Sequence, residues 1–176
     1  QLVTRHWSGE LPECSRHVED QMARVLDLFD AHGVRGTFFV LGLVARAKPD
    51  LVKRIAARGH EVASHGNSHT LLHQLGRAEI AHELRDSRER LSDLVGQDVV
   101  GFRAPEFSIG LSNAWVLEEV AAAGYRYDSS VYPIRSRRYG IAEFPRGPSA
   151  LPLASGRSLH ELPIGCSRFR AGNRPQ

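Results

Sequence analysis

The sequence predicts an α/β fold in which parallel strands alternate with helices. Apolar residues recur at helical spacing through Val18–His32, and Gly33 follows as a helix terminator. The next segment, Gly36–Leu41, is a short apolar run rich in β-forming residues, which is typical of a buried strand. This alternation continues along the chain, and repeated alternation implies parallel strands joined by crossover helices.

The remaining elements follow from the same signals. Further helices are expected at Leu51–Arg58, Arg77–Val95 and Ser112–Ala123, and further strands at Glu61–Ser64, Val99–Phe102, Tyr125–Asp128 and Glu161–Ile164. A proline near the first turn and a following glycine delimit the helix at 51–58, and Ser112 is the expected N-cap of the last helix. Residues 132–160 are rich in Pro, Gly, Ser and Arg, which predicts a long irregular connection.

Length and composition indicate one ordinary globular domain spanning residues 1–176. The chain has 41% hydrophobic and 24% charged residues. Its net charge of +3 is mild and the basic residues are scattered, which argues against a nucleic-acid partner. Only Arg135–Arg138 clusters, and we interpret it as a solvated loop. No apolar run approaches the length of a membrane span.

The two cysteines, Cys14 and Cys166, lie far apart with no CxxC spacing, which argues against a structural zinc knuckle or a redox motif. Whether they pair is left open. The first residues lack the basic-then-apolar pattern of a signal peptide, so the cytoplasm is the favoured compartment. The oligomeric state is also left open.

Chemically versatile residues follow three of the predicted strands: His65, Arg103 and Asp128. Ligand sites of α/β sheets and barrels form at the carboxyl ends of the strands, so these residues are expected to converge on one site.

His65 and His69 are candidate ligands of a divalent metal. Their spacing of four would place both imidazoles on one face if the chain turns helically after the strand. The alternative is a histidine pair on a helix surface. His73 extends the spacing, but eight helical residues rise about 12 Å, whereas ligand nitrogens lie about 2 Å from their ion. We therefore expect His73 at the surface or outside the ligand set.

Arg103 precedes a proline in the segment FRAPEF and can hold a carboxylate through two parallel hydrogen bonds. Asp128 is its candidate partner; the alternatives are a surface arginine beside a turn and an aspartate that caps the turn at 129–130. Glu106 is either a site carboxylate or a charge at the rim, and the rim is favoured.

Four segments in this order and at these distances resemble the NodB-homology polysaccharide deacetylases: GTFFVLG, EVASHGNSH, GFRAPEFS and YRYDSSVYP. More narrowly, they resemble the bacterial exopolysaccharide-locus branch. The resemblance is strongest over residues 18–133. It implies a distorted (β/α) barrel with fewer than eight parallel strands, incomplete at both ends in this chain. It also implies hydrolysis of an N-acetyl, occasionally an O-acetyl, group from a sugar.

The resemblance assigns roles to five positions. His65 and His69 match the two histidine metal ligands, and Arg103 matches the arginine that orients the catalytic base. Asp128 matches the carboxylate that pairs with this arginine, and the backbone amide of Glu106 matches a donor to the oxyanion. The implied cofactor is a divalent metal, zinc first, with cobalt, nickel or manganese as alternatives. The implied partner is an acetylated polysaccharide or oligosaccharide.

The chain departs from the family at both ends. The Asp-rich first motif, which supplies the third ligand and the base, has no match, because His17–Asp20 (HVED) fits acids at a helix start. The last motif, with the acid histidine, is also missing. It should follow the expected strand Glu161–Ile164, whereas His160 precedes that strand and is a poor substitute. Either the chain lacks its true ends, which we favour, or it is a degraded relative. The alternative functions are hydrolysis of a small non-sugar amide and non-catalytic binding of metal or glycan.

Overall fold

The computed structural model describes residues 17–135 and 139–165, and this part contains one open six-stranded sheet. The strands are β1 (Thr37–Val40), β2 (Glu61–Ser64), β3 (Gly101–Phe102), β4 (Tyr127–Asp128), β5 (Ser149–Ala150) and β6 (His160–Glu161). Their order across the sheet is β1-β2-β3-β4-β6-β5, and every neighbouring pair is parallel except β5 with β6. The α/β class with mostly parallel strands is therefore confirmed. Cys14, Cys166 and most of the Arg135–Arg138 cluster lie outside the described residues.

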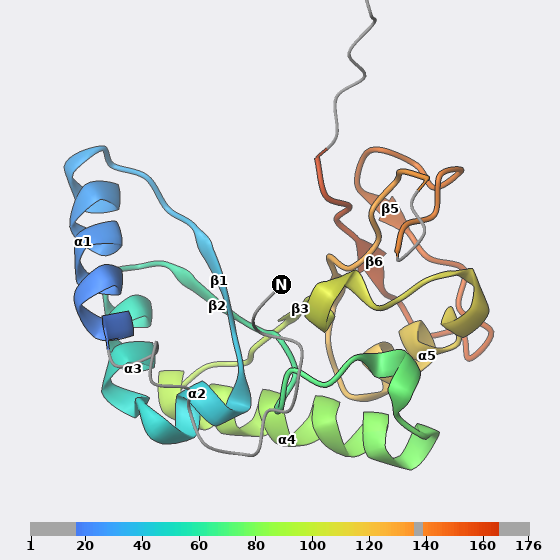
Figure 1. The fold of residues 1–176 in the computed structure, drawn as a ribbon, viewed down its shortest axis with the longest axis horizontal. Helices are drawn as coiled ribbons and strands as arrows, with labels where there is room; N and C mark the ends of the chain where they lie inside the picture. The colour runs from blue at the N-terminus through green and yellow to red at the C-terminus, as the bar shows by residue number, and fades with distance from the viewer. Residues whose placement is uncertain (1–16, 136–138, 166–176) are drawn as a thin grey trace, which may run out of the picture.

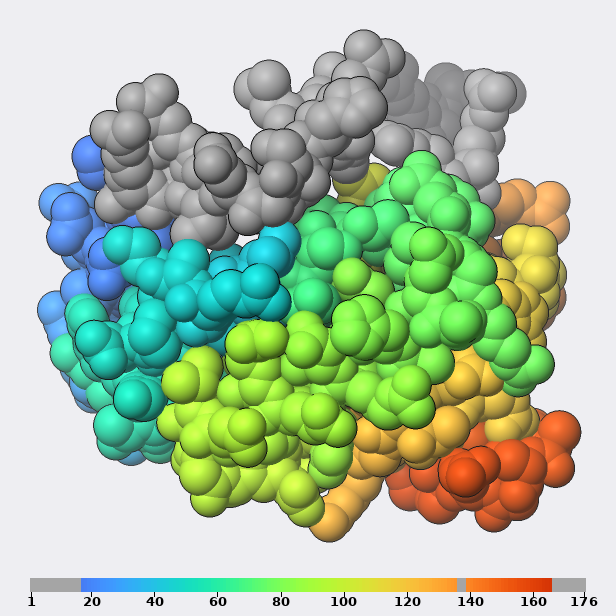
Figure 2. Space-filling model, turned by 90° about the horizontal axis from the view of Figure 1, so that it is seen from below, coloured from blue at the N-terminus to red at the C-terminus, as the bar shows by residue number. Residues whose placement is uncertain are grey.

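Five α-helices surround this sheet in the described residues: α1 (Val18–Ala31), α2 (Gly42–Ala47), α3 (Pro49–Ala57), α4 (Arg77–Val95) and α5 (Val116–Ala122). The first three lie at the β1 end of the sheet, whereas β5 and β6 form the opposite end (Figure 1). The long helix α4 packs against α2, α3 and α5, and it forms a yellow-green band across one face (Figure 2). Within the described ranges, no helix is both long and apolar enough to cross a membrane.

The hydrophobic core lies between α4 and the middle of the sheet. Ile80, Leu84 and Leu91 form the buried stripe of α4 and are 0% exposed. The Phe102 ring at the end of β3 packs on the Tyr125 ring with centroids 5.3 Å apart, and the Tyr125 hydroxyl donates to the Leu84 carbonyl at 2.9 Å. This packing fixes α4 behind the strands that carry the candidate site.

The helix at 77–95 and the strand at 61–64 have the predicted bounds, but other elements differ. The predicted helix Ser112–Ala123 splits into a 3-10 turn, Leu111–Asn113, and α5. The Asn113 side chain holds this turn, since its Oδ1 accepts from the Gly110 amide at 2.7 Å and its Nδ2 donates to the Ser108 carbonyl at 2.8 Å. Ser112 is therefore not the cap of a longer helix. The helix α2 and the antiparallel strand β5 were not predicted, and β5 lies inside the expected irregular connection.

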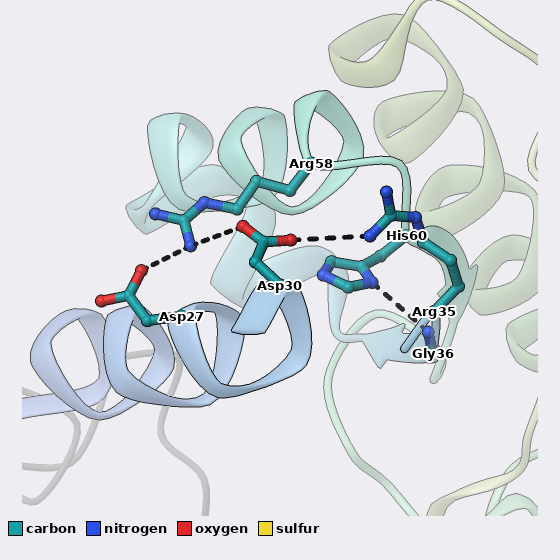
Figure 3. Close-up of polar contacts among 6 residues, drawn as sticks. All are labelled: Asp27, Asp30, Arg35, Gly36, Arg58 and His60. Carbon is teal, nitrogen blue, oxygen red and sulfur yellow. Dashed lines mark hydrogen bonds and ion pairs between the residues drawn. The ribbon is translucent and has the colours of Figure 1, made fainter. Parts of the chain in front are cut away.

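Polar contacts at the amino ends of β1 and β2 connect α1 to α3 (Figure 3). The Arg58 guanidinium reaches Asp27 at 2.6 Å and Asp30 at 3.2 Å. The His60 ring packs against Phe29 and Phe38, and its Nδ1 accepts from the Gly36 amide at 3.3 Å. These contacts lie at the edge of the sheet opposite to the candidate site, where they hold α1 against α3. The ion pairs are largely solvent-exposed, so each contributes little to stability.

Candidate functional site

The candidate residues lie on one row at the carboxyl edge of the sheet. His65 and Arg103 directly follow β2 and β3, and Asp128 is itself the last residue of β4. The residue after each strand donates its amide to the neighbouring strand: His65 to Val40 at 2.9 Å, Arg103 to Ser64 at 2.9 Å and Ser129 to Phe102 at 2.8 Å. The parallel register therefore brings the loops after β2, β3 and β4 together, which is the convergence expected from the strand-end positions.

The two histidines lie beside each other with one ring held in a defined tautomer. The His65 and His69 ring centroids are 5.2 Å apart. His65 Nδ1 is 2.7 Å from the Arg103 carbonyl oxygen, which can only accept, so Nδ1 carries the proton. Burial is the main cause that lowers the pKa of His65 to about 4, and it also lowers the pKa of His69. Both rings are thus neutral at neutral pH, with Nε2 of His65 left for a metal.

The loop that carries these histidines does not turn helically, contrary to the expectation. Gly66 has φ +81° and His69 has φ +62°, both in the left-handed region, so the chain bends tightly between them. The loop is instead held by α2, because the Gly42 amide donates to the Gly66 carbonyl at 2.9 Å and the Leu43 amide to the Asn67 carbonyl at 3.0 Å. Tertiary hydrogen bonds, rather than helical spacing, bring the two rings together.

Glu83 of α4 holds the same loop from the other side, and the sequence analysis missed it. Its carboxylate Oε2 accepts from the backbone amides of Asn67 at 2.9 Å and Ser68 at 3.0 Å. No pattern separates Glu83 from the other acids on this charged helix, so only the tertiary structure identifies it.

Replacing Glu83 by alanine in the full-length protein is expected to weaken metal binding. Two loop amides would lose their acceptor, and outer residues that orient metal ligands typically contribute about 10- to 100-fold in affinity. Competition with a chromophoric chelator measures this change. The control is Glu89→Ala, which removes the same charge from an exposed position of the same helix. Equal metal affinity of both variants would show that Glu83 does not support the site.

Arg103 binds the turn after β4 in a different way from the prediction. Its Nε donates to the Ser129 carbonyl at 3.0 Å and its Nη2 to Ser129 Oγ at 2.7 Å, while the guanidinium lies 4.0 Å from the centre of the Phe39 ring. The expected direct ion pair with Asp128 is absent from this described region. Asp128 instead accepts from the amide and hydroxyl of Ser130, so it caps the turn, the alternative role. Burial lowers the pKa of Arg103, and the negative charge of Asp128 raises it.

Glu106 lies in a strained turn directly after the Arg103 segment. Glu106 has φ +49° and Phe107 has φ +54°, and two consecutive non-glycine residues in this region indicate stored strain of the kind found at binding sites. The negative charge of the Glu106 carboxylate raises the pKa of His69, against the larger effect of burial. The side-chain charge of Glu106 therefore acts on His69.

The described residues contain two candidate ligands but no complete metal site. No group of three His, Cys, Asp or Glu side chains within ranges 17–135 and 139–165 is arranged to hold an ion. His73 and His160 are exposed, as expected for residues outside the ligand set. The histidine pair also borders an apolar hollow of about 370 Å³ whose other walls come mainly from α1, β1, α2 and α3. The neutral rings and the held tautomer fit a metal ion, which would need a further ligand.

Comparison with known proteins decides the family. The profile of the polysaccharide deacetylases matches residues 13–127, well over half of the chain. The chain belongs to the polysaccharide deacetylase family. This result confirms the resemblance at the level of the family, while the narrower exopolysaccharide-locus branch stays a prediction. It also gives the open sheet its context as part of a family barrel.

Curated relatives of this deacetylase-family chain act on amino-sugar polymers and oligomers, according to their names. A chitooligosaccharide deacetylase of Rhizobium leguminosarum bv. trifolii is 34% identical over 118 residues, 67% of this chain and 50% of the relative. A peptidoglycan-N-acetylmuramic acid deacetylase of Bacillus subtilis is 34% identical over 104 residues, 58% of this chain and 38% of the relative. The chain thus spans half or less of the length of these relatives.

Solved structures of deacetylases share the fold of this chain. A Mycobacterium smegmatis crystal structure assigned to the polysaccharide deacetylases superposes with a TM-score of 0.67 at 30% identity, covering 82% of this chain and 45% of that one. The peptidoglycan N-acetylglucosamine deacetylase Bc1960 gives a TM-score of 0.54 at 30% identity, covering 64% of this chain and 52% of that one. The PuuE allantoinase, at 22% identity and a TM-score of 0.65, shows the same fold only.

Proposed function

We propose that this chain belongs to a single catalytic domain that hydrolyses N-acetyl groups of an amino-sugar polymer with a divalent metal. The observation that carries the proposal is the His65–His69 pair, with centroids 5.2 Å apart and His65 Nδ1 bonded to the Arg103 carbonyl. A ligating histidine commonly donates its second nitrogen to such a carbonyl. Zinc is the expected metal, with cobalt, nickel or manganese as alternatives.

The chemistry requires an activated water, a polarised carbonyl and proton transfer. When bound, a divalent metal lowers the pKa of water and polarises the acetyl carbonyl. In this proposal Arg103 orients the base through its fixed position on Ser129, and the Glu106 amide donates to the developing oxyanion from its strained turn. Asp128 supports Arg103 through the turn at 129–130 and by its charge. Besides these residues, the proposed reaction needs a third ligand, a base and an acid.

Acetate release tests the proposal. The full-length protein, loaded with zinc, cobalt, nickel or manganese in turn, is incubated with N-acetylated chito-oligosaccharides and with peptidoglycan. We expect metal-dependent release of acetate, loss of activity after chelation and recovery when the metal is restored. Fully deacetylated chito-oligosaccharide is the substrate control. Bound metal without acetate release from any of these substrates would contradict the proposal and favour a small amide substrate or a non-catalytic binding role.

A further inference from the structure

Two carboxyl groups are buried next to each other below the candidate site. Asp128 ends β4 and Glu161 ends β6, and the two residues are register partners in this parallel pair. Both are 0% exposed. Two ionised carboxylates in such a position repel each other and lose their hydration, so one of them must be neutral.

Asp128 accepts more hydrogen bonds from its surroundings than Glu161 does. Asp128 Oδ1 accepts from the Ser130 hydroxyl at 2.6 Å, and Oδ2 accepts from the Ser130 amide at 3.0 Å. Glu161 Oε1 accepts from the Val131 amide at 2.9 Å, while its buried Oε2 has no donor among the described residues. The two residues are register partners on neighbouring parallel strands, so their side chains lie side by side on one face of the sheet, and a proton on one carboxyl lets it donate to the other. Because Asp128 accepts more hydrogen bonds, it is the anion, and Glu161 carries the proton.

We propose that Glu161 is a positioning residue, a neutral carboxylic acid that donates its proton to Asp128 and thereby holds the segment Arg103–Glu106 in place. The inference rests on the proposed function, because that segment acts in the proposed reaction.

A continuous chain of hydrogen bonds connects the pair to this segment. The Ala104 amide donates to Ser130 Oγ at 2.8 Å, and the Ser130 hydroxyl donates to Asp128. Arg103 donates to Ser129 Oγ, whose own hydroxyl donates to the Leu162 carbonyl at 2.6 Å. Residues at and after β6 therefore hold the turn that follows β4. That turn holds the Ala104 backbone and the Arg103 guanidinium. Buried networks of this kind are rigid only when every member is satisfied.

The electrostatics of the pair agree with this geometry. Burial, and then the charge of Asp128, raise the pKa of Glu161 to about 10, and the positive charge of Arg103 lowers it by less. Burial also raises the pKa of Asp128, while hydrogen bonds from Glu161 and Ser130 lower it. With the anion on Asp128, as the hydrogen-bond donors indicate, the buried pair carries one negative charge opposite the positive charge of Arg103.

Two variants of the full-length, metal-loaded protein test the role. Glu161→Gln keeps the shape, stays neutral and can still donate to Asp128, so kcat and KM are expected within about threefold of the parent. Glu161→Ala removes the donor, and kcat is expected to fall about 10- to 100-fold with KM and bound metal nearly unchanged. The matched control is Glu61→Gln, which changes a carboxylate bonded to Thr37 and Tyr127 at the other end of β2. An equal loss in both Glu161 variants, or none in the alanine variant, overturns the proposal.

Infrared spectroscopy tests the proton without relying on activity or on the alanine variant. At neutral pH, the spectrum of the parent minus that of Glu161→Gln should contain the C=O band of a protonated carboxylic acid. A difference that shows only carboxylate bands overturns the proposal. If the band is present but acetate release is not, the proton assignment stands and the proposed function fails.

The pH dependence of stability has a defined sign. The folded protein keeps a proton that the unfolded chain releases near the usual glutamate pKa of about 4.3. Raising the pH from this value toward about 10 should therefore destabilise the parent relative to Glu161→Gln. The urea midpoint of the parent is expected to fall below that of the variant progressively between these values. A constant difference in midpoint would contradict a proton held by Glu161.

Discussion

Replacing His65 or His69 by alanine in the full-length protein is expected to remove stoichiometric metal binding and to lower acetate release by more than about 100-fold. Removing a metal ligand should lower metal affinity and activity more than removing an outer residue does, and an outer residue typically contributes about 10- to 100-fold. The two rings lie with centroids 5.2 Å apart, so each variant leaves one isolated imidazole. Metal content after dialysis, measured by atomic absorption, and acetate release give the two readouts.

His73→Ala is the matched control for these variants. His73 follows His69 at the same spacing of four, but it is exposed in the 3-10 turn Leu72–Gln74. Its replacement should leave metal content and activity unchanged. Full metal content in both His65→Ala and His69→Ala would show that the ion is held elsewhere.

Arg103→Lys is expected to lower kcat by about 10- to 100-fold, the usual effect of changing a group that orients a site, while bound metal is retained. Lysine keeps the positive charge but cannot reproduce the two directed donors to the Ser129 carbonyl and hydroxyl. It also loses the planar contact with the Phe39 ring. The His65 bond is to the Arg103 backbone, so the ligand tautomer should survive. Steady-state kinetics with parallel metal analysis separates these effects.

Arg88→Lys provides a control with the same chemistry in another place. Arg88 also donates to a backbone carbonyl, that of Val99, and to one side chain, Asp98, but near the opposite end of β3. Its replacement should leave kcat unchanged. If both arginine variants lose activity equally, the effect of Arg103→Lys would reflect general destabilisation rather than orientation of the site.

The elements that the sequence predicted best are those whose signal is local. The helix Arg77–Val95 has its predicted bounds because an apolar stripe of the right period runs between residues that start and stop a helix, with Gly96 at φ +69° closing it. The strands at 101–102 and 127–128 are shorter than predicted, since strand ends depend on the neighbour available for pairing. The helix α2 was missed because bonds to the loop at 66–67 contribute to it.

The same division holds for the candidate site. Residue type and position near the end of a strand identified four candidates in the sequence: His65, His69, Arg103 and Asp128. Their contacts could not be predicted in this way, because a hydrogen bond depends on side-chain directions set by register and packing. Arg103 therefore bonds to Ser129 and not to Asp128, and the supporting carboxylates Glu83 and Glu161 come from distant segments.

The sequence by itself determined the α/β class, the family and the edge of the sheet at which the chemistry gathers, because periodicity, strand-end position and motif order are properties of neighbouring residues. Only the tertiary structure decided how the site is held. The non-helical loop of the two histidines, the anchor at Glu83 and the buried pair of Asp128 with Glu161 each join residues at least 15 positions apart. Such contacts arise from the parallel register and from the low-dielectric interior, where an unpaired amide or carboxyl is too costly to persist.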